Sequence, residues 1–203
     1  MKLSEYIGSQ FGKPRGVFGS ICCLVMNVIN KKLYFGIVNS LDIHKDSHVL
    51  DIGYGNGNLT KLLYNRYGCR ISGVDISEDM KKLATEKNIK GVLTSRIHFD
   101  IGDCCDLSFD DEFFDAIVSV NTIYFWNDTK KGLNEIFRTL KKGGIFSNAI
   151  YSKEWMNKTS YTKKGFKLFS PDEIEVLAKE IGFEDVKIIS LKDGDAFVIN
   201  CKK

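Results

Sequence analysis

The chain has 203 residues and a net charge of +3, with 43% hydrophobic and 27% charged residues. This length and composition fit one domain with an apolar core and a charged surface. The positive excess is too small and too scattered to indicate nucleic-acid binding. The apolar run at 21–29 is too short to span a bilayer.

The six cysteines give no sign of a disulfide framework or a metal site. They include two adjacent pairs and no C-x-x-C spacing, and the three histidines are scattered. Adjacent cysteines rarely bridge to each other, and zinc sites need a clustered set of ligands. We therefore expect reduced thiols in a cytoplasmic protein that does not insert into a membrane.

The N-terminal region precedes the first predicted strand and is expected to be helical. Residues 4–11 predict a short helix, 13–16 a break, and 17–38 a second helix with apolar residues along one side. The alternation of strands and helices begins only after this region. We expect residues 1–45 to form a helical cap segment and residues 46–203 to form one compact domain.

A glycine-rich turn lies between the first predicted strand and the helix that follows it. The apolar run at 48–50 is followed by Asp51 and then by Gly53, Gly55 and Gly57, at every second position. Glycines let a ligand approach the backbone closely, and the first N–H groups of the next helix point into the same space. The order of strand, turn and helix therefore predicts a ligand site here.

The second predicted strand, 70–75, also ends in an acid. Asp75 lies about 20 residues after the turn, which is the spacing at which a carboxylate accepts hydrogen bonds from a ribose. NAD and S-adenosylmethionine both contain a ribose, so Asp75 does not choose between them. Asp75 could instead cap the next helix, although Ser77 is the better candidate for that cap.

Two further segments extend the alternating pattern. Residues 101–109 contain Asp103 and Cys104 in a Gly-Asp turn, which by itself is an ordinary feature. Residues 114–120 predict a buried strand, which leads into a polar and aromatic stretch at 121–127. The helix that follows is expected to end at 141–144, Lys-Lys-Gly-Gly, before a strand at 145–150.

The C-terminal part predicts one helix and a final hairpin. Residues 151–169 are polar and aromatic without a clear period. Ser170 is expected to cap a helix with Pro171 in its first turn, and this helix ends near Gly182. Strands at 186–190 and 196–201 follow, joined by a tight turn. Alternating strands and helices indicate a parallel sheet covered on both faces.

The motifs from 49 to 150, about half of the chain, resemble those of class I S-adenosylmethionine (SAM) methyltransferases. Residues 51–57 give D-x-G-x-G-x-G, and Gly-Asp-Cys-Cys-Asp-Leu-Ser-Phe at 102–109 is similar to the family's G-D-A-x-x-L-P-F. The family's L-K-P-G-G has Lys142 in place of proline here. The resemblance is to the broad group that includes ubiquinone and menaquinone methyltransferases.

This resemblance implies both a fold and a set of binding roles. The implied fold is α/β: a doubly wound, Rossmann-like, seven-stranded and mostly parallel sheet with an antiparallel last strand. In the family the glycine turn wraps the methionine end of SAM, the acid at Asp75 binds the ribose, and the acid at Asp103 accepts from the adenine amino group. The backbone N–H of Cys104 would meet a ring nitrogen.

The predicted function is methyl transfer from SAM to a small-molecule acceptor by in-line displacement, which leaves S-adenosylhomocysteine (SAH). No catalytic residue, metal ligand or oligomeric state is assigned. Asn121, Tyr124 and Trp126 are candidates on the substrate side. The candidate cofactor-binding residues are Asp51, Gly53, Tyr54, Gly55, Gly57, Asp75, Ile76, Asp103, Cys104 and Val120.

Three alternatives remain open from the sequence. An NAD-type oxidoreductase would use G-x-G-x-x-G, but the last glycine of that pattern is Asn58 here, and a final hairpin is foreign to ordinary dehydrogenases. A SAM-binding module without catalysis would bind SAM and methylate nothing. A protein or RNA methyltransferase is a further possibility. The proline motifs of amino and cytosine-C5 methylation are absent, which disfavours adenine-N6, glutamine-amide and cytosine-C5 acceptors.

Overall fold

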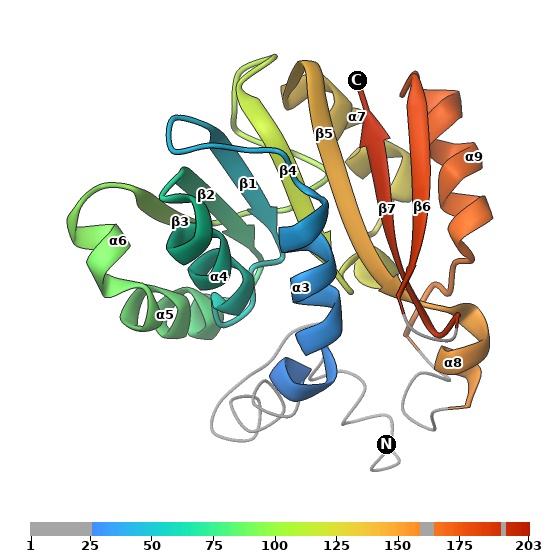
Figure 1. Cartoon of the computed structure of the whole chain (residues 1–203), viewed down its shortest axis with the longest axis horizontal. Helices are drawn as coiled ribbons and strands as arrows, with labels where there is room; N and C mark the ends of the chain where they lie inside the picture. The colour runs from blue at the N-terminus through green and yellow to red at the C-terminus, as the bar shows by residue number, and fades with distance from the viewer. Residues whose placement is uncertain (1–25, 159–164, 192–193) are drawn as a thin grey trace.

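The computed structural model describes residues 26–158, 165–191 and 194–203. The helix predicted at 4–11, the break at 13–16 and the first part of the helix predicted at 17–38 lie outside these residues. The described residues form a seven-stranded sheet (Figure 1). Its strands are β1 (His48–Ile52), β2 (Arg70–Asp75), β3 (Ile97–Ile101), β4 (Phe114–Val120), β5 (Leu140–Tyr151), β6 (Asp185–Leu191) and β7 (Ala196–Lys202).

The sheet has the strand order β3-β2-β1-β4-β5-β7-β6. The first five strands in the chain pair in parallel, and β7 is antiparallel to both β5 and β6. The order reverses direction between β1 and β4, so these two strands mark the switch point where ligands bind in open α/β sheets. The predicted Rossmann-like fold with an antiparallel last strand is confirmed.

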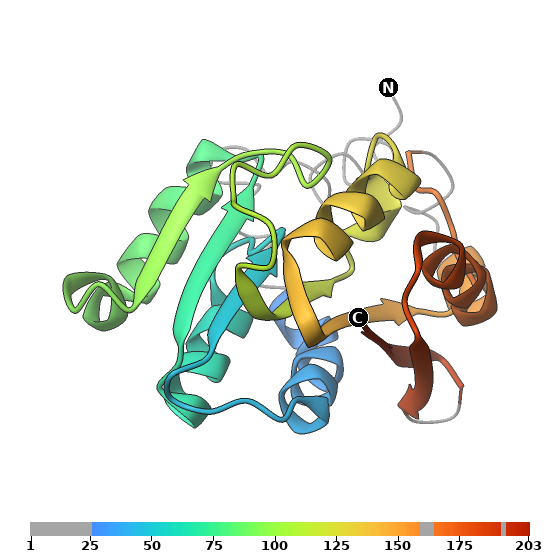
Figure 2. The same cartoon turned by 90° about the horizontal axis from the view of Figure 1, so that it is seen from above.

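Helices cover both faces of the sheet. On one face lies α3 (Lys31–Ser40), which packs on β5 and β7, and α7 (Thr129–Thr139) lies on the opposite face of β5 beside α9 (Pro171–Ile181) (Figure 2). The other helices are α4 (Asn58–Tyr67), α5 (Glu78–Lys87), α6 (Ile89–Leu93) and α8 (Lys153–Asn157). Strands β1 and β4 lie between these layers, and their side chains are almost all buried.

The described part of the N-terminal segment is helical at 26–29 and again in α3, with Asn30 between the two stretches. Helix α3 extends two residues beyond the predicted end at 38. It approaches the sheet closely at Gly36, where an added Cβ would lie 2.7 Å from Leu191 and 2.8 Å from Val198. This helix is therefore part of the layer on the sheet, and a domain boundary at residue 45 stays a prediction.

The end of α7 differs from the prediction. The helix ends at Thr139, and residues 141–144 lie in β5 instead of forming the helix stop. Leu140 is fully buried and pairs with Phe114 of β4, which draws the backbone into the sheet. The Lys203 ammonium donates to the carbonyls of Phe137 (2.6 Å) and Leu140 (2.8 Å), so a residue at the far end of the chain binds the helix terminus.

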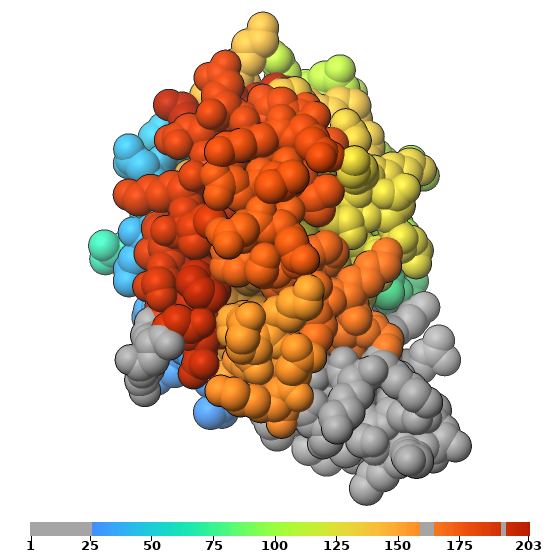
Figure 3. Space-filling view, turned by 90° about the vertical axis from the view of Figure 1, so that its right-hand side faces the viewer, coloured from blue at the N-terminus to red at the C-terminus, as the bar shows by residue number. Residues whose placement is uncertain are grey.

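Helix α9 begins and ends as predicted. The Ser170 hydroxyl accepts from the backbone N–H of Glu173, and the Glu173 carboxylate accepts from the backbone N–H of Ser170. This reciprocal capping box stabilises the first turn. Gly182 ends the helix in the left-handed conformation. The space-filling view in Figure 3 shows this helix and the last hairpin covering one side of the molecule.

Candidate active site

A cavity of about 230 Å³ lies at the switch point, beyond the carboxyl ends of β1, β2 and β4. Most of the residues predicted to bind ligand come together on its walls, although they are spread over the sequence from 51 to 126. These residues are Asp51, Gly53, Tyr54, Gly55, Asp75, Ile76, Asp103, Cys104, Val120, Asn121 and Trp126. Gly57 lies behind the turn, and Tyr124 lines a second, adjoining cavity.

The glycine turn is held by hydrogen bonds of its own backbone. Gly53 N–H donates to the Val74 carbonyl at 2.7 Å, and Gly57 N–H donates to the Tyr54 carbonyl at 2.9 Å. Gly53, Gly55 and Gly57 all have positive φ, a conformation that glycine adopts without strain. A Cβ on Gly53 would lie 2.3 Å from Thr122, whereas a Cβ on Gly55 would meet nothing within 4 Å. Gly53 is therefore a packing residue, and Gly55 leaves open space in the cavity.

Asp75 connects the turn to the next helix. Its carboxylate accepts from the N–H of Gly55 at 2.9 Å and from the N–H of Ser77 at 3.0 Å. Ser77 is the residue before α5, as predicted, but its side chain makes no cap hydrogen bond to that helix. Burial raises the pKa of Asp75, and the N–H donors oppose this shift. The carboxylate is thus fixed in place at the edge of the cavity.

Asp51 forms part of the floor of the cavity. It is 2% exposed, and the Thr60 hydroxyl donates to its carboxylate at 2.6 Å. Burial raises the pKa of Asp51 to about 7, because a charge is poorly solvated there. The hydrogen bond from Thr60 opposes this shift, and the charge of Asp75 adds to it. A nearby cation would favour the ionised form of Asp51.

The loop after β3 carries Asp103 and Cys104. Asp103 accepts from the N–H of Cys105 at 2.9 Å, and the Cys105 thiol donates to the Asp128 carbonyl at 3.2 Å. The possible ligand atoms of Asp103, Cys104 and Cys105 lie within 4.8 Å of one another. Burial raises the pKa of the Cys104 thiol, so it stays protonated.

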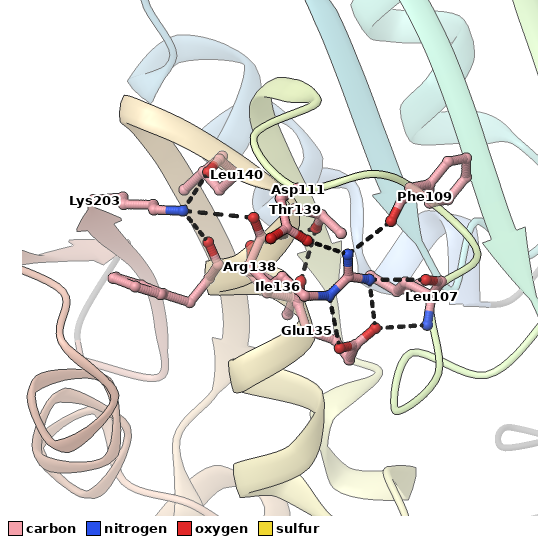
Figure 4. A network of polar contacts seen from close by, with 10 residues as sticks. Leu107, Phe109, Asp111, Glu135, Ile136, Arg138, Thr139, Leu140 and Lys203 are labelled. Atoms are coloured by element: carbon pink, nitrogen blue, oxygen red, sulfur yellow. Dashed lines mark hydrogen bonds and ion pairs between the residues drawn. The ribbon is translucent and has the colours of Figure 1, made fainter.

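Helix α7 holds this loop from outside the cavity (Figure 4). The Arg138 guanidinium donates to the carbonyls of Leu107 (2.9 Å) and Phe109 (2.8 Å). The Glu135 carboxylate accepts from the N–H of Leu107 at 2.9 Å and pairs with Arg138 at 2.8 Å. The side chains of one helix turn therefore fix the backbone that follows Asp103.

Asn121 directly follows β4 and lies where the two cavities adjoin. It has a φ of 56°, which is unusual for a residue other than glycine. Its amide donates to the Asn30 side chain at 2.7 Å and accepts from the Tyr124 hydroxyl at 3.2 Å. Asn121 lines both cavities. A strained backbone at such a place is typical of functional sites.

The second cavity measures about 30 Å³ and is walled by aromatic and aliphatic side chains. It lies near the carboxyl end of β5 and the start of α8. Its lining residues are Met26, Ile29, Asn121, Tyr124, Phe125, Tyr151, Trp155, Met156 and Phe166. Trp126 belongs to the first cavity instead, where its indole N–H donates to the Thr122 hydroxyl at 3.2 Å.

Comparison with known proteins places the chain in a family. Residues 50–147 match the model of a methyltransferase domain. The chain is 36% identical over 144 residues to a demethylmenaquinone methyltransferase of Bacteroides fragilis, which covers 70% of this chain and 59% of that protein. It is 28% identical over 165 residues to an uncharacterized methyltransferase, YdaC, of Bacillus subtilis, which covers 81% of this chain and 86% of that protein.

A solved structure that is similar to this chain supports the same family. A putative SAM-dependent methyltransferase of Methanococcus maripaludis superimposes with a TM-score of 0.71 at 26% identity, covering 93% of this chain and 95% of that one. The chain belongs to the class I SAM-dependent methyltransferases. Its cofactor is SAM, and its reaction is methyl transfer. Because the chain spans only about three fifths of the Bacteroides protein, that relative's acceptor does not follow from the match.

The first cavity, lined by Asp51, Asp75 and Asp103, is the cofactor cavity. Its charges suit this methyltransferase better than they would suit a dehydrogenase. Three carboxylic acids line it, Asp51, Asp75 and Asp103, and no Lys, Arg or His is among its described lining residues. The N–H of Gly55, which could have met a pyrophosphate, already donates to Asp75. Acidic walls attract a sulfonium and repel a pyrophosphate. The cavity therefore has the polarity that SAM requires.

Several cavity residues of the methyltransferase were not predicted from the sequence. Met26, Asn27, Asn30 and Tyr34 reach the cofactor cavity from the N-terminal region, and Asn127 reaches it from the loop after β4. The only local signal was a polar residue, Asn27, within an apolar helical run. The contact between Asn30 and Asn121 joins positions 91 residues apart, which no local pattern reveals.

The histidines lie outside the two cavities. His98 is exposed on β3 beside Asp100, and His48 lies at the start of β1 against Ser72. Neither lines either of the two cavities, and burial lowers the pKa of His48 to about 4. No helix among the described residues is long and apolar enough to cross a membrane.

Proposed function

We propose that this methyltransferase acts on a small molecule. The observation that carries the proposal is that the two cavities adjoin, with Met26, Asn121 and Phe125 lining both. The space beside the cofactor cavity is thus a narrow, apolar recess. Sites of this kind, concave and mostly apolar with a few polar groups, are typical of small-molecule ligands.

We propose that SAM lies across the carboxyl ends of β1, β2 and β4. Asp75 would accept from the two ribose hydroxyls, since a carboxylate has capacity beyond its bonds to Gly55 and Ser77. Asp103 would accept from the adenine amino group, with the Cys104 N–H at the ring. The open space at Gly55 would receive the methionine end.

The chemistry requires little from the side chains. Bound SAM supplies a methyl group that is already activated by the sulfonium. The protein holds the acceptor in line with that methyl group and excludes water, and such positioning can supply roughly 7–11 kcal/mol of the barrier. No His is among the described lining residues of either cavity, and we assign the three acids of the cofactor cavity to binding the cofactor, so we name no general base. We infer that the acceptor atom arrives with a free electron pair.

The test is to follow a labelled methyl group from SAM into fractionated cell extract. The proposal predicts that label enters molecules of low mass and that Asp75→Ala abolishes the transfer. Label in protein or RNA would contradict the proposal and favour a macromolecular acceptor. Binding of SAM without any transfer, across fractions from several growth conditions, would favour a binding module without catalysis.

A further inference from the structure

The second cavity points to the chemical class of the acceptor. We infer that it receives the leading end of the acceptor and selects an uncharged, apolar, ring-bearing molecule. This inference rests on the proposed small-molecule function, which it makes more specific. Its support comes from the side chains that line the cavity, from its hydrogen bonds and from its charges.

The walls have the composition to contact a flat apolar group. The rings of Phe125 and Phe166 lie 4.6 Å apart, and those of Tyr151 and Trp155 stack at 4.0 Å. Such rings bind another ring by edge and face contacts. At about 30 Å³ the cavity is smaller than an aromatic ring, so a ring would enter only as the walls move apart. Two of its walls are Met26 and Met156, whose unbranched side chains rearrange readily to admit a ring.

The polar atoms of this cavity already bond to one another. The Asn121 amide donates to Asn30 and accepts from the Tyr124 hydroxyl. That hydroxyl also accepts from the N–H of Tyr151 at 2.9 Å. Burial raises the pKa of Tyr124, so the phenol stays neutral and is no base. A charged ligand group would have to break these bonds, and burying it unpaired would be unfavourable.

The described lining of the second cavity holds no charged side chain, and the charged side chains near it make contacts of their own. No Lys, Arg, His, Asp or Glu is among the described residues that line the second cavity. Lys32 places its ammonium 4.9 Å over the Tyr151 ring, and Lys167 donates to the carbonyls of Trp126 (2.9 Å) and Asn127 (2.8 Å). An anionic group would therefore have to compete with these contacts for the cations that the structure describes here. An ammonium would find neither a counter-charge nor a group to remove its proton among the described lining residues, and a protonated amine accepts no methyl group.

The experiment uses three probes with the same ring and different charges. They are 4-fluorobenzyl alcohol, 4-fluorobenzoate and 4-fluorobenzylamine, each titrated by fluorine NMR at pH 7 into the full chain saturated with SAH. We expect the neutral alcohol to bind at least about tenfold more tightly than either charged probe. Equal or tighter binding of a charged probe would overturn the inference, as would a failure of all three to bind.

Two variants locate the binding. Phe166 lines the second cavity and not the first. Phe166→Ala should therefore weaken binding of the alcohol by about fivefold or more and leave the affinity for SAH unchanged. Phe35→Ala is the matched control, because Phe35 is 45% exposed and lines neither cavity. No effect of Phe166→Ala would also overturn the inference. If SAH itself does not bind, the proposed function fails first, and calorimetry with SAH alone reveals that failure separately.

Discussion

At the scale of single residues, burial sets the behaviour of the cofactor cavity. Asp51 has one hydrogen-bonding hydroxyl beside it, that of Thr60, and an acidic neighbour in Asp75. A carboxylic acid in that position holds its proton to unusually high pH. The same burial makes it a strong attractor of a cation once it ionises, because the local dielectric constant is low. The charge state of this one group therefore couples stability to ligand binding.

This coupling predicts a stability that depends on pH. The folded-state pKa of Asp51, about 7, lies above its ordinary value of 3.8, so the folded protein binds the proton more tightly than the unfolded chain does. Its contribution to stability is full below about pH 4 and is lost as the pH rises through 7. We expect the free energy of unfolding of the wild type, relative to Asp51→Asn, to fall by about 2–3 kcal/mol between pH 5 and 8. Urea denaturation of both proteins checks this, and a difference that does not change with pH would refute it.

Two glycines of the same turn should respond differently to alanine. Both have positive φ, which imposes roughly 1–2 kcal/mol of strain on alanine. At Gly53 the new methyl group would also collide with Thr122, so we expect Gly53→Ala to lose about 3 kcal/mol or more of stability. Gly55→Ala should fold and lose SAH binding, because its methyl group points into the open cavity. Thermal unfolding and calorimetry separate the two effects, and similar stability of both variants would contradict this assignment.

At the scale of elements, helix α7 connects the periphery to the cofactor cavity. Its Arg138 and Glu135 bind the backbone of the loop at 107–109, which continues from Asp103 and Cys104. The loop has no regular structure of its own along 102–113. The fixed position of Asp103 therefore depends on side chains of a helix that is not among the described lining of the cavity. The Lys203 contacts at the end of α7 anchor that helix in turn.

The Arg138 clamp is the set of hydrogen bonds from this side chain to the loop at 107–109. Its removal should loosen the loop and weaken binding of the cofactor. We expect Arg138→Met to raise the Kd for SAH by about tenfold, since several charge-assisted hydrogen bonds that position the loop are lost. Lys130→Met is the control on the same helix, because it removes only the exposed pair with Glu180. It should leave SAH binding unchanged. Equal affinity of Arg138→Met and the wild type would show that the loop holds its position without the clamp.

At the scale of the whole molecule, the switch point between β1 and β4 brings distant motifs to one edge of the sheet. Local patterns predicted much of this arrangement. The bounds of β2 at 70–75 follow from the alternation of strands and helices along the chain. The cap at Ser170 follows from hydrogen bonds between residues that are close in the sequence. The parallel sheet and its last hairpin follow from the order of these elements.

Features that depend on long-range contacts escaped prediction. The end of α7 is set by Lys203 and by the pairing of Leu140 with Phe114, which outweigh the local stop signal at 141–144. The packing of Gly57 could not be predicted either, because the repeat of glycines does not say which one lines the cavity, and its role toward the cofactor stays a prediction. Gly57 packs against α5, where a Cβ would lie 2.4 Å from Asn88. The entry of Asn30 into the site depends on the tertiary fold alone.

The central claim is that the acidic cavity at the switch point binds SAM through Asp75 and Asp103. The most direct measurement is a calorimetric titration of the wild type, Asp75→Ala and Asp103→Ala with SAH and with NAD. We predict that SAH binds the wild type and that each variant weakens it by about tenfold or more, while NAD does not bind. Binding of NAD, or SAH affinities that the two substitutions leave unchanged, would contradict the account.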